Sequence, residues 1–77
     1  MTPEEILGKL KEIVHTIKPK LDLSNVTLES SLVKDLGIDS LSMLLLSLAT
    51  ENEFGLQFEP DVKFNTIGEV VDYIARK

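Results

Sequence analysis

The chain contains no cysteine, no tryptophan and only one histidine, His15. Without cysteine it has neither a disulfide framework nor a thiolate metal site, and one histidine would leave a zinc ion to carboxylates, so we expect no metal. The longest unbroken apolar run is 43–46, which is far too short to cross a bilayer. The first residues also lack the basic and then apolar pattern of a secretory signal. We therefore expect a cytoplasmic protein with no stable membrane insertion.

Length and charge narrow the class of protein and its partners. A chain of 77 residues predicts a single domain, 1–77. The formal net charge is −5, and most of it lies in residues 38–77, which hold seven Asp or Glu against three Lys or Arg. An acidic half repels phosphate backbones. We therefore expect no nucleic-acid partner and predict protein partners with basic surfaces.

Capping signals predict where helices begin and end. Thr2 and Glu5 match a capping box, and Pro19 ends the helix that they start. Thr66 and Glu69 form a second such pair before the apolar positions of a last helix. Apolar residues recur through the long connection between 20 and 38, so we expect this connection to pack onto the helices.

Between these two ends, the sequence predicts a further helix over 40–54, which Gly55 ends in a left-handed conformation. Residues 31–36 are expected to form one helical turn closed by Gly37, and 62–64 a second short turn. No strand-type alternation is present. The fold class is therefore predicted to be all-α, as a small four-helix bundle with a long first loop and a short third helix.

Two apolar stripes run along the helix predicted over 40–54. One stripe consists of Leu41, Leu44, Leu45 and Leu48. The other consists of Met43, Leu46, Thr50 and Phe54, with Ser47 beside them. Periodicity alone favours the leucine stripe as the core-facing one, and it leaves open that both stripes are buried or that the leucines face outward.

Ser40 is the candidate working residue, because Asp39 is placed to cap the helix and Ser40 then lies at its first turn. A nucleophilic role lacks a base, since there is no G-x-S-x-G elbow and His15 lies in the first helix. A phosphate ester suits this position better, because free backbone N–H groups and the helix dipole favour an anion.

Carboxylates offer two further candidates. Asp35 and Asp39 flank the Gly37 turn and suggest an acid and base pair or a cation site. A structural account is simpler: Asp39 caps the helix over 40–54, and Asp35 lies at the end of the preceding turn. A loose acidic cluster in the second half is either a solvated face or a surface for a basic partner. Its members are Glu51, Glu53, Glu59 and Asp61.

Residues 35–41, Asp-Leu-Gly-Ile-Asp-Ser-Leu, resemble the D-L-G-x-D-S-L attachment motif of acyl carrier proteins, and the resemblance extends over essentially the whole chain. It implies a carrier and not an enzyme. A phosphopantetheinyl transferase would attach 4′-phosphopantetheine from coenzyme A to Ser40, between Asp39 and Leu41. The arm would carry acyl thioesters to acyl-loading and condensing enzymes of fatty acid or related lipid and polyketide biosynthesis, and the carrier would be a monomer.

The resemblance also assigns the two faces of the helix after Ser40. The implied partner face consists of Leu41, Ser42, Leu44, Leu45, Leu48 and Glu51. The implied acyl pocket consists of Leu32, Val33, Met43, Leu46, Thr50, Phe54, Ile67 and Val71. On this assignment the leucine stripe faces outward, against the preference of periodicity alone.

Departures from the family pattern suggest a specialised carrier. Ser42 and Leu45 stand where fatty-acid carriers usually have acidic residues, and we interpret this as a narrow set of partners met through apolar contact. The segment 58–65 is shorter than usual, which argues against the short third helix. A free-standing aminoacyl or peptidyl carrier is the nearest alternative, although Ile38 replaces the glycine usual there, and an unmodified interaction domain is the third.

Overall fold

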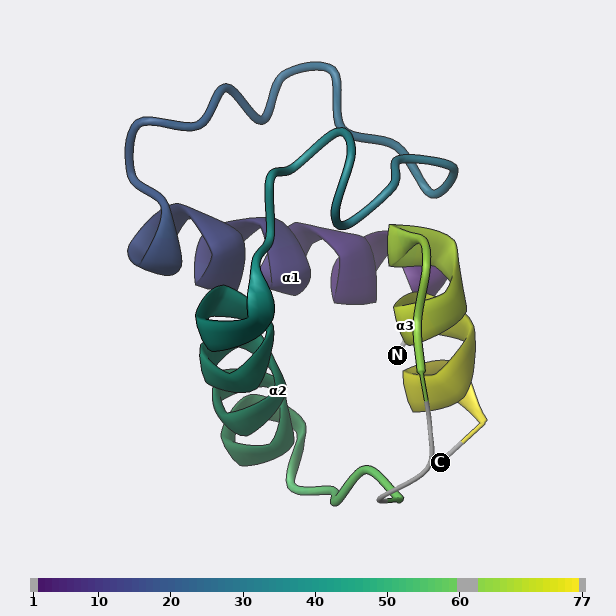
Figure 1. Ribbon diagram of the computed structural model, residues 1–77. Coiled ribbons are helices and arrows are strands. Elements are labelled where there is room, and N and C mark those ends of the chain that lie inside the picture. Colours follow the sequence, from purple (N-terminus) through teal and green to yellow (C-terminus); the bar gives the residue numbers. More distant parts are fainter. Residues whose placement is uncertain (1, 60–62, 77) are drawn as a thin grey trace.

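The computed structural model describes residues 2–59 and 63–76 and contains three helices: α1 (Pro3–Ile17), α2 (Ser40–Phe54) and α3 (Ile67–Ala75). α1 packs against both α2 and α3, while the long segment 18–39 leaves the end of α1 and returns to the start of α2 (Figure 1). The all-α class is confirmed. Over the described part of the chain no helix is long and apolar enough to span a membrane.

The helix ends are those that the capping signals predict. Thr2 Oγ1 accepts a hydrogen bond from the Glu5 backbone N–H at 3.2 Å, and the Glu5 carboxylate accepts from the Thr2 N–H at 2.9 Å. Thr66 and Glu69 form the same reciprocal pair at the start of α3. Gly55 ends α2 with a φ of 65°, which is the left-handed conformation that glycine adopts at least cost.

The hydrophobic core lies where α1 and α3 face α2 and the long loop. Each helix contributes its buried apolar positions at helical spacing. α2 contributes Leu46 and also Thr50, whose hydroxyl donates to the Leu46 carbonyl at 2.6 Å. The other buried apolar residues are Ile6, Leu10, Val14, Val26, Leu32, Leu36, Ile38, Ile67, Val70, Val71 and Ile74.

The long loop is tied to the start of α3, as its apolar residues predict. The Leu32 N–H donates to the Asn65 carbonyl at 2.9 Å, and the Gly68 N–H donates to the Leu28 carbonyl at 2.7 Å. A Cβ on Gly68 would lie 2.7 Å from the Leu28 carbonyl oxygen, so this close approach requires glycine. The backbone hydrogen bonds therefore hold the loop against the start of α3.

The predicted count of four helices is wrong for the described residues. The expected turn at 31–36 is present, with the Gly37 N–H donating to the Val33 carbonyl at 3.1 Å. The short third helix was expected over 62–64; Lys63 and Phe64 are not helical, and Val62 lies outside the described residues. Phe64 packs with Phe58 and Tyr73, with ring centroids 5.3 to 5.6 Å apart.

Candidate attachment site and docking face

Ser40 is the first residue of α2 and is exposed to solvent. Asp39 caps the helix, and its carboxylate accepts a hydrogen bond from the Ser42 backbone N–H at 2.8 Å. The Met43 N–H donates to the Asp39 carbonyl at 2.8 Å, so Asp39 accepts hydrogen bonds from two backbone N–H groups in the first turn of α2. Gly37, with a φ of 65°, turns the chain into this cap. The predicted placement of Ser40 at an exposed helix start is confirmed.

Hydrogen bonding stabilises the ionised form of the Asp39 carboxylate. The Ser42 backbone N–H and then the Ser42 hydroxyl lower the pKa of Asp39, and the positive charge of Lys18 lowers it further. A carboxylate at a helix N-terminus also interacts favourably with the helix dipole. Near neutral pH the Asp39 carboxylate is therefore an acceptor that fixes the backbone around Ser40.

A surface hollow of about 530 Å³ opens beside Ser40. Its lining is mainly apolar and comes from the loop and the first turn of α2: Val33, Ile38, Asp39, Ser40 and Met43. Ile38 is buried and donates its N–H to the Leu32 carbonyl at 2.9 Å, so the floor of the hollow is rigidly placed. An exposed hydroxyl beside an open, partly apolar hollow fits the attachment of a long, flexible group.

Among the described residues, part of the predicted acyl pocket lines a small cavity. A cavity of about 10 Å³ lies behind the hollow, too small for an acyl chain without movement of its walls. Three predicted residues line it: Met43, Leu46 and Thr50. Sequence reasoning missed the rest of its wall, which consists of Ser47, Phe58, Phe64 and Val70.

The other predicted pocket residues lie elsewhere. Leu32, Ile67 and Val71 are core residues with 3% or less of their surface exposed, and Phe54 is half-buried against the core. Val33 is 62% exposed and lines the surface hollow beside Ser40 rather than the small cavity. The reason is the 31–36 turn, which buries Leu32 and Leu36 and rotates Val33 outward.

The leucine stripe of α2 faces outward. The exposed fractions are 67% for Leu41, 56% for Leu44, 45% for Leu45 and 54% for Leu48. Leu46 and Thr50 occupy the core-facing side instead, at 4% and 0%. The preference of periodicity alone was therefore wrong, and the orientation that the resemblance implied is the one observed.

The two carboxylates of α2 are engaged within the molecule. Glu51 Oε2 accepts a hydrogen bond from the Phe58 backbone N–H at 2.6 Å, and Glu53 forms an ion pair with Lys9 at 3.2 Å. Glu59 is exposed, and Asp61 lies outside the described residues. The acidic cluster is therefore not a single free surface. Glu51, which was predicted to belong to the partner face, is half-buried, and its carboxylate is hydrogen-bonded within the molecule.

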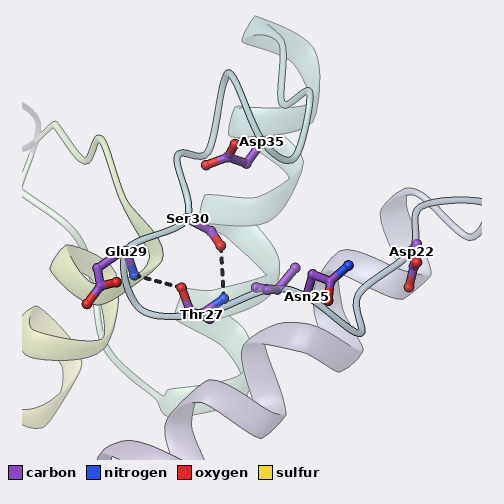
Figure 2. Close-up of a pocket in the computed structure, with 7 residues that line it drawn as sticks. Asp22, Asn25, Thr27, Glu29, Ser30 and Asp35 are labelled. Atoms are coloured by element: carbon purple, nitrogen blue, oxygen red, sulfur yellow. Dashed lines mark hydrogen bonds between the residues drawn. The ribbon is translucent and has the colours of Figure 1, made fainter.

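A second hollow, of about 490 Å³, lies in the long loop (Figure 2). Its polar groups serve the loop's own turns: the Thr27 N–H donates to Ser30 Oγ at 2.9 Å, and the Glu29 N–H donates to Thr27 Oγ1 at 3.3 Å. Asp35 accepts from the Ser31 N–H at 2.6 Å, which is the structural role expected of it. Within the described residues no cluster of three or more acidic or histidine side chains is arranged to hold a metal ion.

The start of α2 thus presents an exposed serine in a capped first turn, beside a partly apolar hollow. Residues 5–74 match the family described as "Phosphopantetheine attachment site". The chain belongs to this family, whose members carry covalent 4′-phosphopantetheine. The family assignment made from residues 35–41 is confirmed.

Relatives that are acyl carrier proteins agree with the family match. The chain is 42% identical to the acyl carrier protein of Thermotoga maritima over 76 residues, which are 96% of this chain and 93% of the relative. It is 40% identical to the acyl carrier protein of Acidothermus cellulolyticus, over 97% of this chain and 90% of the relative. It is 39% identical to the meromycolate extension acyl carrier protein of Mycolicibacterium smegmatis, over 97% of this chain and 77% of the relative.

Proposed function

We propose that this chain carries acyl intermediates on a 4′-phosphopantetheine arm attached to Ser40, in fatty acid or related lipid biosynthesis. The observation that carries the proposal is the exposed Ser40 hydroxyl, held by the Asp39 cap at the mouth of an apolar hollow, in a chain that matches the phosphopantetheine family over 5–74. When bound, the arm supplies a thiol that holds acyl groups as thioesters. The chain itself has no cysteine, so it offers no competing thiol.

Attachment of the arm requires a hydroxyl on the chain that another enzyme can reach. A phosphopantetheinyl transferase would take the proton from Ser40 Oγ, and the oxygen would form a phosphodiester as adenosine 3′,5′-bisphosphate leaves coenzyme A. Asp39 positions the backbone around Ser40, and Leu41 lies on the exposed side of the same turn. The chain performs no chemistry on the acyl group, so its role is that of a carrier and not an enzyme.

An acyl chain would be sheltered behind the hollow, between α2 and the segment that leads to α3. Met43 lines both the hollow beside Ser40 and the cavity of about 10 Å³, so it separates the two. Displacing Met43 together with Phe58 and Phe64 would enlarge the cavity. Leu46 and Thr50 would form its inner wall, and the core residues Leu32, Ile67 and Val71 would lie behind it.

The acyl carrier proposal is favoured over a peptidyl carrier by Ile38 and by the relatives. Ile38 is 2% exposed and packs in the core where peptidyl carriers usually have glycine. The similar proteins named above are acyl carriers of 39 to 42% identity. We further propose that the chain is a cytoplasmic monomer and that its partners are acyl-loading and condensing enzymes.

The proposal is tested by incubating the chain with coenzyme A and a broad-range phosphopantetheinyl transferase and measuring the intact mass. The wild type should gain one phosphopantetheine, and Ser40→Ala should gain none. Ser47→Ala, which removes another hydroxyl of α2, should still gain one. A mass gain in Ser40→Ala, or none in the wild type, would rule out Ser40 as the attachment site.

A further inference from the structure

The small cavity behind the hollow has one wall that does not come from a helix. Met43 and Thr50 belong to α2 and Val70 to α3, whereas Phe58 and Phe64 lie between the two helices in the sequence. Resting on the proposed function, we propose that these two rings set the length of the acyl chain that the carrier shelters. The class of cargo is then a short to medium straight acyl chain, of which about six carbons are enclosed.

The helical walls of the cavity are fixed by packing. Thr50 is fully buried, and its hydroxyl donates to the Leu46 carbonyl at 2.6 Å. Val70 is also buried, on the core side of α3. Phe58 and Phe64 are half-buried and lie in non-helical backbone, so rotating their side chains uncovers less surface than moving a helix. A chain that enters the cavity therefore gains its space on the side of the rings.

The backbone beside each ring is held, which limits how far this wall can move. The Phe58 N–H donates to Glu51 Oε2 at 2.6 Å, at the end of α2. Asn65, the residue after Phe64, accepts a hydrogen bond on its carbonyl from the Leu32 N–H at 2.9 Å. An acyl chain therefore gains room by rotation of a ring, and not by withdrawal of the backbone that carries it.

Contacts among the rings limit the opening to one of them. The centroids of Phe58 and Phe64 are 5.3 Å apart, and each ring also packs on Tyr73 of α3, at 5.3 and 5.6 Å. Rotating one ring leaves the other on Tyr73, whereas rotating both removes every contact of the cluster and exposes two phenyl groups. The space of one ring is a benzene-sized cavity of about 150 Å³, which encloses about six carbons. Longer chains would project into solvent.

The test compares the melting temperature (Tm) of the full chain with arms of increasing length. A broad-range transferase and the series from butanoyl- to tetradecanoyl-coenzyme A place each arm on Ser40. In the wild type, Tm should rise by about 2–5 °C for every two carbons up to hexanoyl or octanoyl, because sheltered methylenes leave water, and then stay level. In Phe64→Ala the rise should continue for about four to six further carbons.

Phe54→Ala is the matched control. Phe54 is a half-buried phenylalanine of α2 that lies outside the described lining of the cavity, so its variant should reach the plateau at the wild-type length. Each variant is compared with its own form bearing the unacylated arm, so a general loss of stability cancels. Where alanine prevents folding, Phe64→Leu should move the plateau by about one or two carbons and Phe54→Leu should not move it.

The outcomes separate this proposal from the proposed function. A wild-type Tm that keeps rising to tetradecanoyl would show that the rings do not limit the pocket and would overturn the proposal. A Tm that ignores chain length, a plateau that the Phe64 variants leave in place, or one that the Phe54 variants move equally would also overturn it. Failure to transfer any arm, measured by intact mass, would count against the proposed function instead.

Discussion

Glu51 Oε2 accepts a hydrogen bond from the Phe58 backbone N–H at 2.6 Å, and this contact ties the last turn of α2 to the segment that leads to α3. It fixes one wall of the small cavity, because Phe58 lines that cavity with Met43 and Thr50. A residue predicted to meet partners therefore has a structural role inside the molecule.

Removing this contact should destabilise the fold. We expect Glu51→Ala to lower the free energy of unfolding by about 1–3 kcal/mol, because the partly buried Phe58 N–H loses a charged acceptor. Glu53→Ala removes the same charge from the same helix but only an exposed ion pair with Lys9, so it should cost about 1 kcal/mol or less. Urea unfolding of both variants measures the difference, and equal losses would contradict the assigned role of Glu51.

Gly68 and Gly8 provide a second matched pair. A Cβ at position 68 would lie 2.7 Å from the Leu28 carbonyl oxygen, so Gly68→Ala should destabilise by about 1–3 kcal/mol as the loop is forced off α3. A Cβ at position 8, in the middle of α1, meets nothing within 4 Å, so Gly8→Ala should stabilise by about 0.5–1 kcal/mol. Opposite signs in thermal unfolding are expected, and a stabilised Gly68→Ala would show that the loop does not need this approach.

The carboxylates with lowered pKa values predict how stability depends on pH. Hydrogen bonds from Thr2 lower the pKa of Glu5, those from Ser24 lower the pKa of Asp22, and those from Ser42 lower the pKa of Asp39. A carboxylate whose pKa is lower in the folded state contributes stability that is fully present above its unfolded pKa and is lost as pH falls through the folded pKa. Stability should therefore be level near neutral pH and fall below about pH 4.

Asp39→Asn tests the contribution of one of these groups. Asparagine is also a good N-cap, so α2 should still form, but the variant has no carboxylate at this position to protonate. The acid-induced loss of stability should be smaller than in the wild type, as measured by urea unfolding at pH 7 and pH 3. An acid loss equal to that of the wild type would show that Asp39 does not contribute to it.

Local signals were sufficient to predict the helix ends. Thr2, Thr66 and Gly55 act on backbone groups within a few residues of themselves, so their roles can be read from the chain. The candidate site was also predictable, because Asp39 and Ser40 are consecutive and occupy one cap and one first turn.

The remaining features depend on contacts between distant parts of the chain. Phe58 and Phe64 pack on Tyr73 and so join the connecting segment to α3. No local pattern in the sequence predicts that these three rings meet. For the same reason Phe58, Phe64 and Val70 were missed as cavity residues. Periodicity likewise favoured the wrong stripe of α2 as the core-facing one, because the helix is apolar on both sides.

The central claim, that Ser40 carries an acylated arm, is tested most directly on the chain purified from its native cell. Proteolysis and tandem mass spectrometry should find 4′-phosphopantetheine on the peptide that contains Ser40, with part of the population bearing an acyl group on the terminal thiol. Fragment ions should place the phosphodiester on Ser40 and not on Ser42 or Ser47. An unmodified Ser40 in cells that modify their other carriers, or an arm on another residue, would contradict the account.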